Sequence, residues 1–147
     1  MPIVQMLASD PDRLVVTINC PQLTPAQVFD CFVIPDLLAL WWPPQAEIEP
    51  RVGGAYHLAW PGQNWHLRGT YTAFARGERL AFTWQWDHEA EIPVRAVEIE
   101  FMAQGDGTLL KLTHGFYSPE DSEEKQGHLD GWLYFLPLLS VLELSPE

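Results

Sequence analysis

The sequence predicts an α+β fold in which about seven antiparallel strands form a sheet and one long C-terminal helix packs across its face. Three observations carry this prediction. The middle of the chain alternates apolar and polar residues, the last apolar run has helical spacing, and two short helical segments follow the first strand. A long helix with a wide apolar stripe must bury that stripe, and the sheet face is the available partner.

The N-terminal part of the pattern is one strand followed by two short helices. Arg13 to Asn19 alternates around aliphatic residues and is rich in β-branched side chains, which is typical of a strand. Thr24 places a hydroxyl N-cap immediately before Pro25 at the first helical position. This helix is expected to stop before Pro35, and Asp36 to Trp42 is interpreted as a second short helical turn that a pair of prolines ends.

Six further strands are predicted between residues 46 and 114, separated by glycine- and proline-containing turns or by an acidic loop. Their ranges are 46–51, 56–60, 65–72, 80–86, 94–102 and 108–114. The clearest alternation lies in residues 80–86, where Trp84 and Trp86 share one face. The same parity predicts that the last strand points His114 inward.

Ser122 to Leu144 is predicted to form the long helix. Its buried face is expected to carry Leu129, Trp132, Leu133, Leu136 and Leu139. Each of two glycines costs the helix about 1 kcal/mol and Pro137 costs it about 3 kcal/mol, relative to alanine. Burial of the apolar stripe outweighs these costs before chain entropy is subtracted. A kink is expected near the proline. Beyond Pro137 the helix is apolar nearly all round, so its end is expected to be buried or to form a homodimer contact.

Length, charge and the absence of certain segments limit the function. The 147 residues have the length of one domain, residues 1–147. A net charge of −12 opposes binding to nucleic acid and to anionic membrane surfaces. Met1 to Asp12 lacks the features of a signal peptide and no apolar window reaches membrane-span length, so we expect a cytoplasmic protein without membrane insertion. Cys20 and Cys31 are interpreted as free, buried residues.

Several motifs resemble the START-like (SRPBCC) superfamily, whose fold is called the helix grip. The segments 24–30 (TPAQVFD), 35–42, 53–54, 112–116 (LTHGF) and 131–136 (GWLYFL) are similar to the branch named after the activator of the heat-shock protein 90 ATPase. The resemblance covers roughly Arg13 to Leu144. It implies hydrophobic ligands held between sheet and helix, cyclase or hydrolase activity in some members, and chaperone binding with a link to the stress response in the namesake. The chain does not include the additional large domain of that co-chaperone, so a chaperone-activating role is not expected.

Aromatic residues on inward parity form either the core or the wall of a ligand pocket, and the sequence leaves both interpretations open. The chain has seven Trp, seven Phe and four Tyr. The residues predicted to line a site for a small, largely hydrophobic molecule are Tyr56, Trp60, Tyr71, Trp84, Phe101, His114, Trp132 and Leu136. Trp41 and Trp42 are candidates for closing its mouth.

His114 carries the alternative prediction of a cyclase- or hydrolase-type enzyme, with Tyr56 or Tyr71 orienting a carbonyl group. A buried histidine with one hydrogen-bond partner is the favoured interpretation, because burial of a polar group requires a partner and nothing more. No nucleophile lies near it in the sequence, so no catalytic residue is assigned. The five histidines lack zinc-site spacing, and neither a metal nor a cofactor is expected. A third alternative is an interaction module related to co-chaperone domains.

Overall fold

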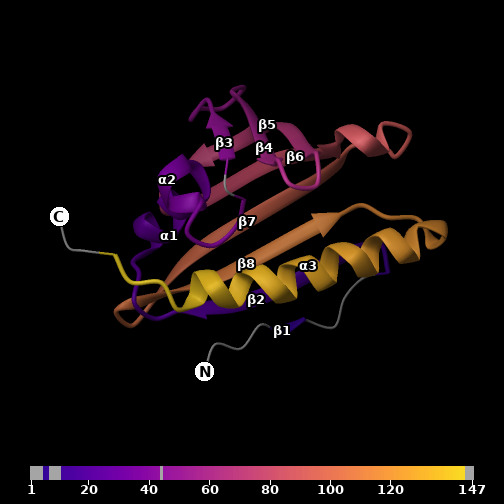
Figure 1. The fold of residues 1–147 in the computed structure, drawn as a ribbon. Helices are drawn as coiled ribbons and strands as arrows, with labels where there is room; N and C mark the ends of the chain where they lie inside the picture. The colour runs from indigo at the N-terminus through magenta and orange to yellow at the C-terminus, as the bar shows by residue number, and fades with distance from the viewer. Residues whose placement is uncertain (1–4, 7–10, 44, 145–147) are drawn as a thin grey trace.

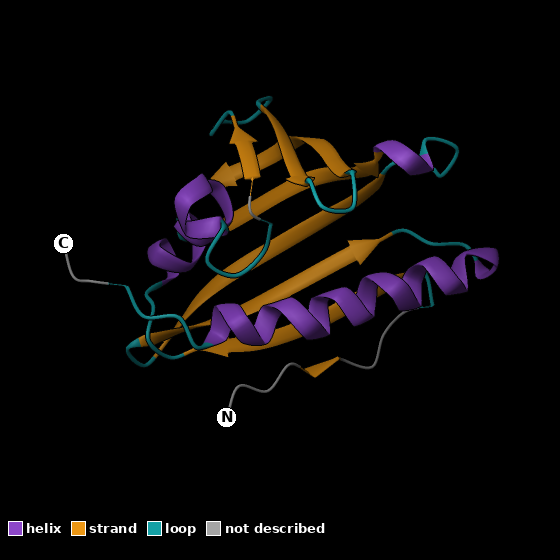
Figure 2. Ribbon diagram, viewed as in Figure 1, coloured by secondary structure: helices purple, strands orange, loops and turns teal. Residues whose placement is uncertain are grey.

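The computed structural model describes residues 5–6, 11–43 and 45–144. The strands are β1 (Gln5–Met6), β2 (Arg13–Cys20), β3 (Gln45–Ile48), β4 (Ala55–Trp60), β5 (Trp65–Ala75), β6 (Arg79–Trp86), β7 (Arg95–Gln104) and β8 (Gly107–Gly115). The helices are α1 (Pro25–Val33), α2 (Pro35–Leu38) and α3 (Ser122–Ser140), with short 3-10 turns η1 (Asp87–Glu89) and η2 (Pro119–Asp121) (Figures 1 and 2). The predicted α+β helix-grip fold is confirmed.

The strands form one antiparallel sheet in the order β1-β2-β8-β7-β6-β5-β4-β3. The eighth strand beyond the expected seven is β1, whose two residues are too short to give a periodic pattern. Strands β3 to β8 follow one another in the sheet, and β2 then pairs with β8. This arrangement leaves one face of the sheet for the C-terminal helix.

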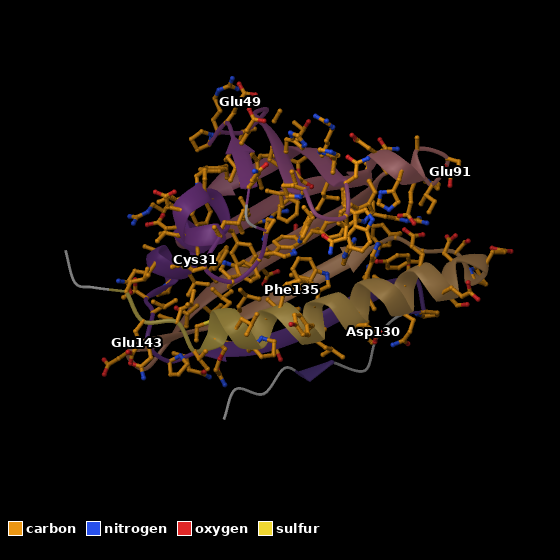
Figure 3. The ribbon with its side chains drawn as sticks, in the orientation of Figure 1. Cys31, Glu49, Glu91, Asp130, Phe135 and Glu143 are labelled. Carbon is orange, nitrogen blue, oxygen red and sulfur yellow. The ribbon has the colours of Figure 1, made fainter. Side chains whose placement is uncertain are left out.

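Helix α3 runs along the sheet beside β2 and β8 (Figure 1). Its buried apolar residues are Leu129, Trp132, Leu136 and Leu139. Leu133, which was expected on the same stripe, is 39% exposed, because it lies about 100° around the helix from Trp132. Figure 3 shows Phe135 extending from α3 toward the sheet, while Asp130 lies on the outer side of the helix.

The C-terminal end of α3 differs from the predicted one. The helix continues through Pro137 and ends at Ser140, four residues before Leu144. The Ser140 hydroxyl donates a hydrogen bond to the backbone carbonyl of Asn19 on β2, which anchors the last turn to the sheet. Leu142 and Leu144 still pack against the core without helical backbone geometry. Apolar character alone therefore overestimated the length of the helix.

Helix α1 begins as its sequence predicts. The Thr24 hydroxyl accepts a hydrogen bond from the Gln27 backbone N–H at 3.2 Å, and the Gln27 side chain accepts one from the Thr24 backbone N–H at 2.9 Å. This reciprocal capping box satisfies two backbone donors at the start of the helix. Cys31 on this helix and Cys20 on β2 are free and buried, as predicted, and burial raises the pKa of each thiol to about 12.

The turn after α2 carries two adjacent tryptophans that differ in burial. Trp41 is buried in the core, where its indole Nε1–H donates to the Cys31 carbonyl at 2.9 Å. Trp42 is only partly buried and faces the tryptophans of β4 and β6. Because α2 ends at Leu38, four residues before the predicted Trp42, both residues lie on the turn that follows the helix. Their rings stack on each other, with centroids 5.6 Å apart, although only Trp41 is buried.

Candidate functional site

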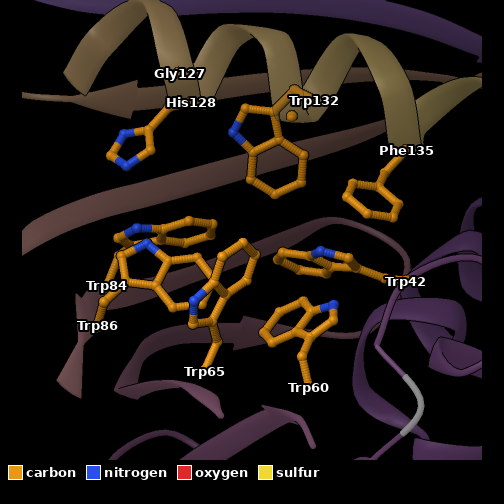
Figure 4. Close-up of a pocket in the computed structure, with 10 residues that line it drawn as sticks. Trp42, Trp60, Trp65, Trp84, Trp86, Gly127, His128, Trp132 and Phe135 are labelled. Atoms are coloured by element: carbon orange, nitrogen blue, oxygen red, sulfur yellow. The ribbon is translucent and has the colours of Figure 1, made fainter. Parts of the chain in front are cut away.

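A pocket of about 230 Å³ lies between α3 and the β4–β5–β6 part of the sheet (Figure 4). Six of the seven tryptophans line it. The lining residues are Trp42, Trp60, Trp65, Trp84, Trp86, Gly127, His128, Gly131, Trp132 and Phe135. The pocket wall is therefore almost entirely aromatic, except where two glycines expose the helix.

Strand periodicity and pairing explain why the tryptophans meet. Trp84 and Trp86 are two residues apart on β6 and therefore share a face. Trp60 ends β4 and Trp65 begins β5, and the two residues are directly paired across the hairpin. Trp65 also shares parity with the buried Leu67, which places its ring on the inner face at the edge of the sheet.

The rings form a continuous set of contacts. The ring centroid of Trp42 lies 5.1 Å from that of Trp132 and 5.9 Å from that of Trp84. Trp86 continues the set, with its centroid 5.3 Å from that of Trp60 and 6.2 Å from that of Trp65. These separations fall in the range in which aromatic pairs attract one another, so the wall is held in place without a ligand.

Gly127 and Gly131 form the helical side of the pocket. They lie one turn apart on α3, and a Cβ atom built on either would meet no other atom within 4 Å. Each glycine costs the helix about 1 kcal/mol relative to alanine. The space beside them is empty, so packing would tolerate a larger residue at either position. Glycine is needed only to keep the pocket open.

We expect Gly127→Ala to raise the free energy of unfolding by about 1 kcal/mol, because alanine restores helix propensity without a clash. Urea denaturation of the two proteins measures this change. A lower midpoint for the variant, with an unchanged slope, would show that the space beside Gly127 is filled.

The polar end of the pocket is built around His128. Its Nδ1 lies 2.7 Å from the Tyr117 hydroxyl and its Nε2 lies 3.9 Å from a carboxylate oxygen of Glu124. Glu124 in turn accepts hydrogen bonds from the Arg95 guanidinium at 2.6 and 3.0 Å. Burial, opposed by Glu124 and assisted by Arg95, lowers the pKa of His128 to about 4. The imidazole is therefore neutral at pH 7.

His114 lies behind this end of the pocket, inward as predicted. Its ring is fully buried and stacks on that of His128, with centroids 4.5 Å apart and planes 8° apart. Trp132 donates its indole N–H to His114 Nδ1 at 3.0 Å. Burial lowers the pKa of His114 well below its ordinary value, and His128 and Arg95 lower it further. Its hydrogen bond positions Trp132.

We expect His128 to make folding sensitive to acid. The unfolded histidine takes up a proton below pH 6.5, but the folded one does so only near pH 4. Stability is therefore lost as the pH falls between these values, by roughly 3 kcal/mol through this one group. Chemical denaturation at pH 7 and pH 4.5 should show a smaller loss in His128→Gln than in the natural protein. An equal loss in both proteins would contradict this assignment.

The structure brings together only part of the predicted site. Trp60, Trp84 and Trp132 line the pocket. Tyr56 and Tyr71 line a separate cavity of about 10 Å³, which is too small for a ligand. The remaining three predicted residues, Phe101, His114 and Leu136, are buried and line neither cavity.

Sequence reasoning also missed part of the lining. Trp65 and Trp86 had inward parity but were not assigned to the site, while Trp42 was assigned only to its mouth. Phe135 and His128 lie three and four residues from Trp132 on α3 and so share its side of the helix, but the predicted stripe did not include them. Gly127 and Gly131 were interpreted only as helix-weakening residues, although their spacing of four places both on one side of α3.

The hydroxyl of Tyr56, a candidate for orienting a carbonyl group in the enzymatic alternative, is engaged by the backbone. The Tyr56 hydroxyl donates to the Thr83 carbonyl at 2.5 Å, and burial raises its pKa well above the ordinary value.

Among the described residues, no cluster of three or more His, Cys, Asp or Glu side chains has metal-binding geometry. No described helix is both long and apolar enough to cross a membrane.

The fold and pocket together define an α+β protein in which a long helix covers an antiparallel sheet and encloses an aromatic cavity. The family model described as "Activator of Hsp90 ATPase homolog 1-like protein" matches residues 22–142. The chain belongs to this family, which confirms the resemblance seen in its motifs. A comparison with the curated proteins gives no match.

Solved structures support the same fold at low sequence identity. A protein from Rhodobacter sphaeroides has a TM-score of 0.80 and 19% identity, covering 95% of this chain and 96% of the other. Protein Ms6760 from Mycobacterium smegmatis has a TM-score of 0.78 and 16% identity, covering 99% of both chains. An HSP90 activator from Plasmodium falciparum has a TM-score of 0.71 and 23% identity, covering 88% of this chain and 94% of the other.

Proposed function

We propose that this protein binds a small, largely apolar molecule containing an aromatic ring in the pocket between α3 and the sheet. The observation that carries the proposal is the concentration of six of seven tryptophans around one cavity. Protein cores are close-packed, so tryptophans that only filled a core would not leave about 230 Å³ of open space beside two glycines.

The size and chemistry of the pocket favour a ligand of one or two rings. An apolar cavity of about 150 Å³ is enough for one benzene ring. The pocket has a larger volume, about 230 Å³, and Trp65 at its edge is 46% exposed, which leaves an aromatic surface available to solvent and to an incoming ligand. Among the lining residues, His128 alone has an ionisable side chain, and it is neutral at pH 7.

Isothermal titration with methylnaphthalene, a neutral two-ring probe, tests the proposal. We expect one saturable site per chain and a negative heat-capacity change, which is the mark of apolar burial on binding. Quenching or shifting of tryptophan fluorescence should follow the same binding curve. Absence of saturable binding in both measurements would contradict the proposed function.

The outer side of α3 supports a second candidate function, association with another copy of the chain. Leu138 is 43% exposed and Val141 is 58% exposed, and both lie at the C-terminal end that the sequence predicts as a dimer contact. Tyr134, 68% exposed, extends the same apolar surface. Sedimentation at high micromolar concentration is expected to show a dimer that Leu138→Glu dissociates. A monomer at that concentration would contradict this second candidate.

A further inference from the structure

We propose that the tryptophan pocket selects an aromatic cation without N–H groups, such as an N-alkylated pyridinium or quinolinium ring, over a neutral ring of the same shape. This inference rests on the proposed function and names the class of its ligand. It follows from three properties of the pocket: its indole surfaces, the sign of its surroundings, and its lack of hydrogen-bond acceptors.

The indole surfaces favour a positive charge. The face of an aromatic ring carries negative potential, and tryptophan has the strongest attraction for cations among the aromatic side chains. Six indoles and the Phe135 ring surround the cavity (Figure 4). A flat cation between the helix and the sheet would contact several of these faces, and the low-dielectric surroundings would strengthen each attraction.

The charges around the pocket also favour a cationic ligand. No lysine or arginine lines the pocket, and His128 is uncharged at pH 7. Arginines on several elements have carboxylate partners, as in the pairs of Arg68 with Asp87 and of Arg79 with Glu98. The net charge is −12, so the field around the protein attracts cations and repels anions.

The hydrogen-bonding groups of the wall exclude an ordinary ammonium ion. Indole N–H groups donate only, and no carboxylate or hydroxyl side chain lines the cavity. The Nδ1 atom of His128 is occupied by the Tyr117 hydroxyl. A primary ammonium would therefore lose its strong hydration without gaining acceptors. A quaternary aromatic nitrogen has no N–H to satisfy and loses less on entering the pocket.

Three probes of similar shape and different charge test the inference: N-methylquinolinium, methylnaphthalene and naphthoate. We expect calorimetry at physiological salt to show that the cation binds about tenfold more tightly than the neutral ring, and that the anion binds most weakly. Equal or tighter binding of the neutral ring would overturn the inference while leaving the proposed function intact. If none of the three probes bound, the proposed function itself would fail.

Trp65→Leu separates the aromatic surface from the overall charge. Trp65 lies at the pocket edge and is 46% exposed, so leucine there preserves apolar bulk without disturbing the core. We expect the variant to lose affinity for both probes because Trp65 lines the pocket, but to bind N-methylquinolinium about threefold to fivefold more weakly relative to methylnaphthalene than the natural protein does. A cation preference that survives in this variant but disappears in molar salt would assign the effect to surface charge and overturn the inference.

Discussion

Gly131→Leu is expected to weaken methylnaphthalene binding by roughly a hundredfold, which corresponds to about 2.8 kcal/mol. A Cβ atom at residue 131 meets no other atom within 4 Å, so the leucine side chain can extend into the pocket instead of clashing with the core. Leucine is also a better helix former than glycine. The variant should therefore be at least as stable as the natural protein while losing its ligand, as calorimetric titration and urea denaturation can measure.

Asp130→Leu is the matched control for this substitution. Asp130 is the preceding residue on α3 and is exposed on the outer side of the helix (Figure 3). Leucine there adds the same side chain without entering the pocket, so binding should be unchanged. If both variants bound methylnaphthalene as the natural protein does, the binding site would have to lie elsewhere.

Glu124→Ala is expected to lower the free energy of unfolding by about 3 kcal/mol, because it leaves the buried guanidinium of Arg95 without its main partner. The Arg95 side chain is 6% exposed and that of Glu124 is 13% exposed. A carboxylate oxygen of Asp121 lies 3.1 Å from Arg95 and still balances part of its charge in the variant. The expected loss of stability is therefore at the low end of the range for a broken buried ion pair. This ion pair joins β7 to α3 beside His128 and so holds the polar end of the pocket.

Glu98→Ala is the control for the loss of one carboxylate. Glu98 pairs with Arg79 at the surface, where their side chains are 39% and 54% exposed. Ion pairs exposed to solvent contribute much less to stability than buried ones, because water screens the attraction. Urea denaturation of both variants at pH 7 should therefore separate them clearly, and equal losses would contradict a special role for the Arg95–Glu124 pair.

Periodicity predicted most of the fold because each strand has one buried face. Trp84 and Trp86 alternate with polar neighbours in the sequence and lie on one face of β6 in the structure, and His114 points inward from β8 as predicted. The helix was predictable because its stripe recurs every three or four residues. The end of α3 was not, since Leu142 and Leu144 pack against the core outside the helix and apolar character does not reveal backbone geometry.

The site was only partly predictable because inward parity does not distinguish the packed core from a cavity wall. Tyr56 and Trp60 share a face of β4, but one lies in the packed interior and the other lines the pocket. The difference depends on what α3 places opposite each ring. Gly131 provides space where a larger residue would fill the gap, and the position of the helix along the sheet became known only from the structure.

The most direct test of the pocket is an NMR titration that follows the seven tryptophan indole N–H signals as methylnaphthalene is added. We predict saturable shifts for the six tryptophans that line the pocket. Trp41, whose N–H donates to the Cys31 carbonyl in the core, should change least. Uniform small shifts, or the largest shift at Trp41, would contradict binding between α3 and the sheet.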